Sequence, residues 1–280
     1  MILPPLREVI RRHHLSADKR LGQHFLLDIN LLARIVALAG DLAGRTVLEV
    51  GPGPGGLTRA LLASGVERLI AIERDPRCIL ALAELQADAG GRLELVEADA
   101  LRLDLDRDLG LAEGERLTIV ANLPYNVGTP LLLNWLDRLE RIDDMILMFQ
   151  REVADRLIAA PGSRIYGRLS VMAQWLCVTE RLINLRSKAF VPPPKVASSI
   201  VRLTPRPAPL APADKRVLER VLAAAFGQRR KMLRTSLKVL GSDPIPHIIA
   251  AGLPETARAE EIDIEGFCRL AETYRRSAHG

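Results

Sequence analysis

The stretch TVLEVGPGPGGLTRALLAS, residues 46–64, places four glycines between a short apolar run and a helical pattern. Glycine lets a backbone approach a ligand closely, and a glycine loop between a strand and a helix is typical of nucleotide-binding sheets. The spacing of Gly51, Gly53 and Gly56 also fits the dinucleotide pattern, which is a weak signal by itself. The lysine and hydroxyl residue of a P-loop do not follow, so a loop of that kind is excluded.

Further strands are predicted on the carboxyl side of this loop, because short apolar runs alternate there with helical periodicity. This alternation predicts a parallel sheet built from right-handed βαβ units. Two extended segments within residues 178–205, separated by the prolines at 192–194, complete an α/β, Rossmann-like sheet of seven mostly parallel strands. The five runs within the first 150 residues are TVLEV (46–50), RLIAI (68–72), LELVEAD (93–99), RLTIVAN (116–122) and DDMILMFQ (143–150).

A domain boundary is predicted at TPRPAPLAPADK, residues 204–215, where four prolines interrupt any periodic pattern. The segments beyond it are helical in period. We therefore expect a large domain over residues 1–207 and a small all-helical domain over residues 208–280.

Size, charge and cysteine usage limit the functional class. The chain has 280 residues, a formal charge of +5 and three widely separated cysteines. A positive balance suits a polyanionic partner, while the cysteines indicate neither a disulfide framework nor a metal site. No apolar run approaches the roughly 20 residues of a membrane span, and no secretory signal is recognisable. These features predict a cytoplasmic protein that acts away from membranes, and we expect it to be a monomer.

Acidic residues follow three successive strands at the edge where ligands of open parallel sheets bind. Glu73 lies about 20 residues after the glycine loop, where a carboxylate can accept both hydroxyls of a ribose. Asp99 can accept from an adenine amino group, and Glu49 adds a third acid. Three carboxylates favour a ligand with positive charge, such as a sulfonium with an ammonium group. The alternative is that these residues only cap helices or face solvent.

The segment NLPY, residues 122–125, ends the fourth strand at the same edge. An adenine amine is a poor nucleophile because its lone pair is delocalised into the ring. The Asn122 side-chain oxygen and a main-chain carbonyl at Leu123 or Pro124 could accept its two N–H groups and localise that pair. Tyr125 offers a ring for the extruded base to stack on. The alternative is an ordinary turn begun by asparagine, with tyrosine packed beneath it.

These motifs, taken together, resemble the ribosomal RNA adenine dimethyltransferases of the KsgA/Dim type. The resemblance runs through LGQHFLLD, EVGPGPGGLT, EADAL, NLPYNVGTPLL, MFQREVADRL, YGRLSVMAQW, FVPPPKVASSIVRL and FGQRRKMLRTSL, nearly the whole chain. It implies a class I methyltransferase sheet, S-adenosylmethionine as methyl donor, and two adjacent adenosines in the 3′-terminal hairpin loop of small-subunit (16S) RNA, within the immature subunit, as acceptor.

The resemblance also implies roles for individual residues. The methyl donor would contact His24, Leu26, Gly51, Gly53, Glu73, Asp99 and Asn122. Catalysis would involve Asn122, Leu123, Pro124 and Tyr125, with Phe190 as a second ring against the target base. Position 24 departs from many relatives, which have asparagine in GQNFL where this chain has GQHFL.

Basic residues suggest where RNA would bind. Within residues 226–240, read as one helix, Arg230, Arg234 and Lys238 recur every four residues beside an apolar face. Solvated surface is the simpler interpretation of such charges. The predicted RNA contacts are Arg11, Arg12, Lys195, Arg229, Arg230, Arg234 and Lys238, and Lys19 and Arg20 extend the basic amino-terminal segment.

Three other functions remain compatible with parts of this pattern. An NAD-dependent oxidoreductase shares the glycine loop and Glu73 but has no use for NLPY. A non-catalytic RNA-binding assembly or transcription factor could keep the fold. Another RNA or DNA adenine N6-methyltransferase would use the same amine chemistry.

Overall fold

The computed structural model describes residues 3–15 and 23–277, and it divides into two compact units. The first comprises residues 1–154 and 180–205, and the second comprises residues 155–179 and 206–280. The chain thus enters the second unit after residue 205, close to the boundary expected after residue 207. Residues 155–179 also group with the second unit, because the helix in that segment packs against the carboxy-terminal helices.

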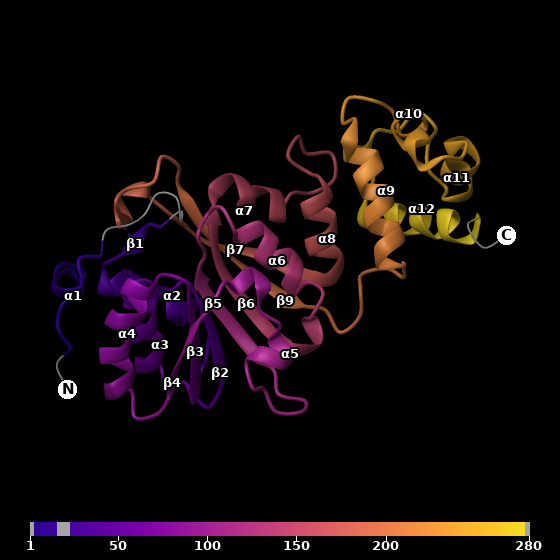
Figure 1. The fold of residues 1–280 in the computed structure, drawn as a ribbon. Helices are drawn as coiled ribbons and strands as arrows, with labels where there is room; N and C mark the ends of the chain where they lie inside the picture. Colours follow the sequence, from indigo (N-terminus) through magenta and orange to yellow (C-terminus); the bar gives the residue numbers. More distant parts are fainter. Residues whose placement is uncertain (1–2, 16–22, 278–280) are drawn as a thin grey trace. The chain divides into compact units, whose positions relative to one another are not determined.

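The first unit is built on a seven-stranded sheet of order β4-β3-β2-β5-β6-β9-β7 (Figure 1). The pairs β2–β3, β3–β4, β2–β5 and β5–β6 are parallel, and β6–β9 is antiparallel. This confirms the predicted mostly parallel sheet, including all five strands read from the first 150 residues. The bounds are β2 (Thr46–Val50), β3 (Arg68–Glu73), β4 (Leu93–Glu97), β5 (Leu117–Asn122), β6 (Ile142–Gln150), β7 (Cys177–Leu185) and β9 (Ser198–Pro205).

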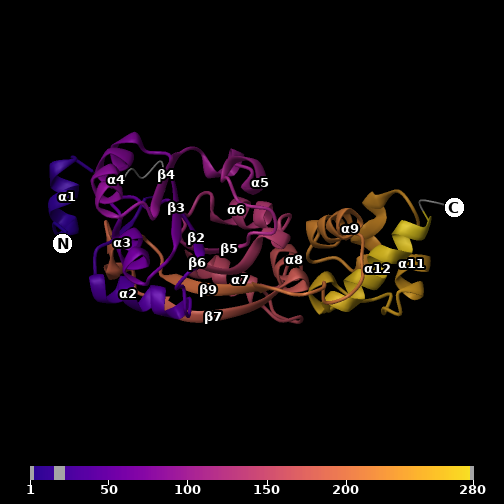
Figure 2. The same cartoon turned by 90° about the horizontal axis from the view of Figure 1, so that it is seen from below.

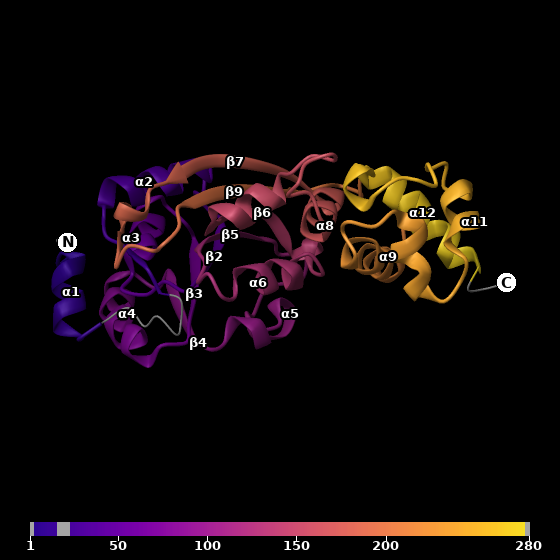
Figure 3. The same ribbon diagram turned by 90° about the horizontal axis from the view of Figure 1, so that it is seen from above.

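Helices cover both faces of this sheet (Figures 2 and 3). In all views α2 (Ile29–Leu38), α3 (Gly56–Ala63) and α4 (Pro76–Asp88) lie on one side, and α5 (Leu105–Asp108) and α6 (Gly128–Trp135) on the other. Asp28 and Asp75 cap α2 and α4 through their carboxylates, and Pro76 occupies the first turn of α4, where no N–H donor is needed. The apolar faces of α2, α3 and α4 close one core with the sheet.

Two short elements complete the first unit. The amino-terminal α1 (Leu6–Arg12) precedes a two-residue strand, β1 (Phe25–Leu26), which pairs antiparallel with β8 (Phe190–Val191). The three prolines at 192–194 lie between β8 and β9, as expected of residues that cannot all join a ladder. None of the helices within the described ranges has the length and apolar character of a membrane span.

The second unit contains helices from two parts of the chain. Its members are α7 (Arg151–Leu157, from Asp155 onward), α8 (Arg168–Leu176), α9 (Lys215–Gly227), α10 (Leu233–Ser236), α11 (Pro244–Ala250) and α12 (Ile264–Ser277). The expected single helix over residues 226–240 is wrong: α9 ends at Gly227, and α10 continues into a short 3₁₀ helix, Leu237–Leu240. Between them Met232 forms a bridge with Arg258, so tertiary pairing interrupts the helical pattern.

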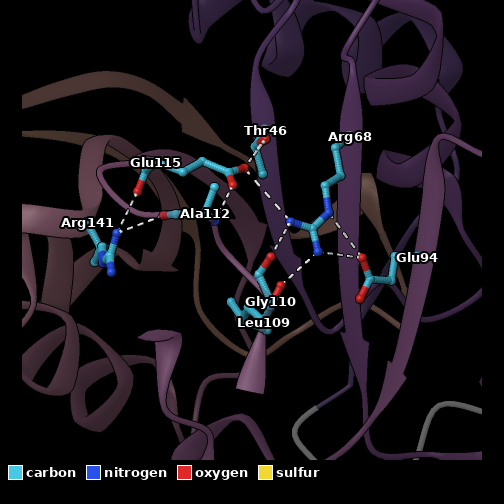
Figure 4. Close-up of polar contacts among 8 residues, drawn as sticks. All are labelled: Thr46, Arg68, Glu94, Leu109, Gly110, Ala112, Glu115 and Arg141. Carbon is cyan, nitrogen blue, oxygen red and sulfur yellow. Dashed lines mark hydrogen bonds and ion pairs between the residues drawn. The ribbon is translucent and has the colours of Figure 1, made fainter. Parts of the chain in front are cut away.

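An arginine network ties strands to loops at the edge of the sheet where β2 and β3 begin (Figure 4). Arg68 donates through Nε and Nη2 to Glu94 Oε2 on β4, at 3.1 and 2.7 Å. It also donates to the carbonyls of Leu109 and Gly110, at 2.7 and 3.3 Å. Glu115 accepts from Thr46 Oγ1 at 2.7 Å, which attaches the same loop region to β2. Arg68 thereby joins two strands to the chain segment that enters β5.

We expect Arg68→Ala to lower the free energy of unfolding by about 1–3 kcal/mol, because the buried Leu109 carbonyl loses its donor. Arg68→Lys should recover less than half of this, since an ammonium group cannot span both carbonyls and Glu94. Urea unfolding measures both values. The matched control is Arg107→Ala, which removes an exposed arginine paired with its neighbour Asp108. Equal losses for Arg68→Ala and Arg107→Ala would contradict the anchoring role.

Candidate active site

A pocket lies beyond the carboxyl ends of β2, β3, β4 and β5, where the sequence predicted it. Most of the expected cofactor and acceptor residues line it. They are His24, Leu26, Glu49, Gly51, Gly53, Glu73, Asp99, Asn122, Leu123, Pro124 and Tyr125. The topology thus brings together residues that are up to 101 positions apart, from His24 to Tyr125, at one edge of the sheet.

The glycine loop lines this pocket, and strand β1 of the amino-terminal segment packs against it. A β-carbon at Gly53, whose φ is +56°, would lie 3.1 Å from the Phe25 ring. A β-carbon at Gly56 would lie 2.9 Å from the Leu26 carbonyl oxygen. Side chains at these positions would therefore push β1 away from the loop, which explains why glycines are needed here.

Glu73 is held in place by main-chain donors. Its Oε2 accepts from Gly53 N at 3.0 Å, and its Oε1 accepts from Arg74 N and Asp75 N at 2.7 and 2.9 Å. Burial raises the pKa of Glu73, and these hydrogen bonds oppose the rise. The carboxylate is fixed at the end of β3 and keeps one lone-pair site, on Oε2, for a ligand hydroxyl.

Glu49 is buried on β2, with 2% of its surface exposed, and its Oε2 has no hydrogen-bond partner among the described residues. Among the described residues, the neighbouring Thr58 hydroxyl also has no partner in good hydrogen-bonding geometry. Burial raises the pKa of Glu49 to about 8; the nearby Thr58 hydroxyl opposes this rise, and the charge of Glu73 adds to it. An unsatisfied carboxyl group on the wall of a pocket is suited to a cationic ligand.

Asp99 caps a short helix, which is the alternative role considered from the sequence. Its Oδ1 accepts from Leu101 N at 3.1 Å and so caps the short 3₁₀ helix Ala100–Arg102. Its Oδ2 lies 3.4 Å from Arg74 Nη1, on an arginine that is largely exposed. The carboxylate still lines the pocket, so capping and ligand contact are compatible at this position.

Asn122 has a defined amide orientation. Its Nδ2 donates to the His24 carbonyl oxygen at 3.2 Å, and Oδ1 has no partner among the described residues. The Pro124 carbonyl accepts from Val127 N and Gly128 N, both at 3.1 Å, at the start of α6. No described donor is bonded to the Leu123 carbonyl. Of the two main-chain acceptors considered from the sequence, the Leu123 carbonyl is therefore the one left for a ligand.

Tyr125 is fixed by a residue that sequence reasoning missed. Its hydroxyl lies 2.5 Å from Ser198 Oγ, and Ser198 is fully buried at the start of β9. The two residues are 73 positions apart, and an isolated serine carries no local signal. Thr58, beside Glu49, was missed for the same reason.

Phe190 lies on the short strand β8 and is buried. It is 1% exposed, pairs with Leu26 through β8 and β1, and does not line the pocket. Stacking of the target base on Phe190 stays a prediction from the resemblance. The centroid of the His24 imidazole lies 6.5 Å from that of the Phe190 ring and 5.3 Å from that of the Tyr125 ring.

The predicted RNA-binding cations fall into two groups. Arg12 pairs with Glu8 and Glu84, and Arg229 donates to the Tyr166 carbonyl at 2.6 Å, so both already have internal partners. The others are exposed and make no ion pair with a described residue: Arg11, Lys195, Arg230, Arg234 and Lys238. Lys19 and Arg20 lie outside the described residues.

Comparison with known proteins shows the family to which this chain belongs. A chain from Azorhizobium caulinodans named "Ribosomal RNA small subunit methyltransferase A" is 56% identical over 281 residues, covering 99% of this chain and 95% of the relative. A dimethyladenosine transferase from Plasmodium falciparum has the same fold, with a TM-score of 0.75, 24% identity and coverage of 91% and 98%. The structure of the 23S rRNA methyltransferase ErmE is also similar, with a TM-score of 0.67, 27% identity and coverage of 89% of this chain and 98% of that chain. The sequence model of the family described as "Ribosomal RNA adenine dimethylase" matches residues 14–276, and this chain belongs to that family.

Proposed function

We propose that this protein transfers methyl groups from S-adenosylmethionine to the N6 amines of two adjacent adenosines in the 3′-terminal hairpin loop of small-subunit (16S) rRNA. The observation that carries the proposal is the oriented Asn122 amide, whose Oδ1 and the neighbouring Leu123 carbonyl are two available acceptors at one edge of the pocket. The small-subunit name of the 56% identical relative supports the choice of RNA. Such an enzyme would act on the immature subunit during ribosome assembly in the cytoplasm.

The residues of the pocket fit S-adenosylmethionine. Glu73, fixed by three main-chain donors, is suited to a ribose hydroxyl, and Asp99 to the adenine amino group. Glu49 has a buried and unsatisfied oxygen, which suits the positive charge of the methionine part. Leu26 and the glycine loop supply the apolar and main-chain walls. When bound, S-adenosylmethionine supplies an electrophilic methyl group on a cationic sulfur.

The acceptor amine is activated by hydrogen bonding and not by a strong base. Asn122 Oδ1 and the Leu123 carbonyl would each accept one N–H, which favours a pyramidal nitrogen with a localised lone pair. The hydrogen bond from Nδ2 to the His24 carbonyl prevents the amide from turning its NH₂ group toward the acceptor. Pro124 follows the Leu123 carbonyl directly, restricts the backbone there and contributes no competing N–H. Tyr125 provides the stacking surface.

The decisive experiment is transfer of tritiated methyl groups to small subunits from a strain that lacks this modification. We expect incorporation of two methyl groups at each of two adenosines, located by mass spectrometry of the RNA. Undermodified large subunits and adenine-containing DNA serve as parallel acceptors. Exclusive labelling of either one would assign another adenine N6-methyltransferase, and tight NAD binding without donor binding would assign an oxidoreductase.

The unpaired cations of the second unit are proposed to bind RNA phosphates. We expect the triple change Arg230→Ala, Arg234→Ala and Lys238→Ala to weaken subunit binding and to reduce the slope of log K against log salt by roughly 2–3, since about 0.7–0.9 counterions are released per phosphate contact. Filter binding at salt concentrations from about 50 to about 200 mM measures this slope.

The matched control removes three arginines that are paired with carboxylates in the first unit, Arg107, Arg116 and Arg138. It changes the net charge by the same amount. An equal change of slope in both triple variants would mean that only net charge matters. The three cations of the second unit would then not form a specific RNA-binding site.

A further inference from the structure

A hydrogen bond between two hydroxyl groups spans the carboxyl end of β6, beside the pocket. Tyr125 Oη lies 2.5 Å from Ser198 Oγ. Tyr125 follows the end of β5, and Ser198 begins β9, while β6 lies between these two strands in the sheet. Ser198 pairs with Gln150, the last residue of β6, because the antiparallel β9 begins where β6 ends. The hydrogen bond therefore links two strands that do not pair with each other.

Ser198 holds a defined position, whereas Tyr125 borders the pocket. Ser198 is fully buried, and the carbonyl of the preceding residue, Ala197, accepts from Arg151 N at 2.9 Å. Tyr125 is partly exposed and lines the pocket. A change of rotamer about the Cα–Cβ bond would carry the Tyr125 ring to another place. The hydrogen bond to a buried partner opposes this change.

The main chain that carries Tyr125 is fixed as well. The Pro124 carbonyl accepts from Val127 N and Gly128 N, both at 3.1 Å, and so closes the turn around Tyr125 at the start of α6. The Tyr125 side chain is thus attached at both ends, which sets the direction of its ring axis before a ligand arrives. A direction that is set in advance lowers the entropy cost of ordering the ring when a base stacks on it.

We propose that Ser198 is a positioning residue for the methyl acceptor: its hydroxyl holds the Tyr125 side chain in the rotamer that keeps the ring on the wall of the pocket, where the target adenine stacks on it. Ser198 is buried and does not line the pocket, so it acts through Tyr125 and does not touch the base. A base on a held ring keeps its amine aligned with the methyl group, which favours transfer. The inference rests on the proposed adenine methyltransferase function.

Two substitutions remove the hydrogen bond from opposite ends. Ser198→Ala deletes the hydroxyl on β9, and Tyr125→Phe keeps the ring but deletes its hydroxyl. We expect each to lower kcat on undermodified small subunits roughly three- to tenfold, because both release the same ring. The double variant should be no slower than either single variant, since one hydrogen bond can be lost only once. Methyl-donor Kd should change less than about twofold in all three.

Ser199→Ala is the matched control. Ser199 is the next residue of β9, is equally buried, and donates from Oγ to Asn184 Oδ1 at 2.7 Å, outside the pocket. Both serine substitutions remove one buried hydroxyl from the same strand, but Ser199→Ala should keep kcat within about twofold of the parent. The parental kcat in Ser198→Ala would overturn the proposal. So would multiplied losses in the double variant, or a Ser199→Ala variant as slow as Ser198→Ala.

The parent protein separates this inference from the proposed function. If the parent transfers no methyl groups to undermodified subunits, the proposed function itself fails. If the parent is active and Ser198→Ala and Tyr125→Phe behave as it does, only the role of Ser198 fails. Calorimetric binding of the methyl donor to each variant verifies that its first unit is folded. Should Ser198→Ala not fold, Tyr125→Phe decides alone, and a parental kcat in that variant overturns the proposal.

Discussion

Asn122→Ala is expected to lower kcat for methyl transfer by roughly 10²–10³-fold, while the Kd for S-adenosylmethionine changes by less than about threefold. The physical reason is that Asn122 Oδ1 is the side-chain acceptor for the adenine amine, and its orientation is set by the donation from Nδ2 to the His24 carbonyl. Without it, the amine keeps its lone pair in the ring and loses its alignment with the methyl group. Single-turnover transfer and calorimetric donor binding give the two numbers separately.

Asn122→Asp is the informative partner of this variant. The aspartate side chain keeps an oxygen that can accept from the amine, but it has no N–H for the His24 carbonyl. The oxygen is therefore present, but its orientation is not fixed. We expect its kcat to fall between the parent and Asn122→Ala. Asn134→Ala, on the exposed side of α6, controls for loss of an amide outside the pocket. Turnover by Asn122→Ala at the parental rate would remove the acceptor role from this residue.

Glu49→Gln is expected to stabilise the protein without ligand by roughly 2–4 kcal/mol near pH 8, and by much less near pH 5. Burial raises the pKa of Glu49 from 4.5 to about 8 in the folded protein. Between these values the folded state keeps a proton that the unfolded state has released. Folding therefore becomes less favourable as pH rises from about 4.5 to about 8, and glutamine, which carries no proton to lose, removes this slope.

The same substitution should have the opposite effect on ligand binding. A cationic methyl donor favours the ionised form of Glu49, so donor affinity of the parent should rise with pH between about 6 and 8, and that of Glu49→Gln should not. Urea unfolding and calorimetric titration at several pH values measure the two effects. Parallel stability curves for parent and variant from about pH 5 to about pH 9 would show that Glu49 is already ionised in the folded protein.

The sequence predicted most of the fold because the responsible signals are local. Alternation of apolar runs and helical periods identified the parallel strands, and the carboxyl ends of such strands meet at one edge. The order of Glu73, Asp99 and Asn122 along the chain, each at the end of its own strand, was therefore enough to predict that they share one pocket. The helix expected over residues 226–240 failed, because the bridge between Met232 and Arg258 joins segments far apart in the chain.

The sequence by itself determined the sheet, the glycine loop and the types of residue around the pocket, since each depends on neighbours within a few positions. Only the tertiary structure decided which groups are engaged with one another. It left Leu123 and not Pro124 as the available carbonyl, tied Tyr125 to Ser198, and brought the His24 ring next to the Tyr125 ring. The last two of these choices depend on contacts between residues 73 and 101 positions apart, and no local pattern in a chain encodes such distances.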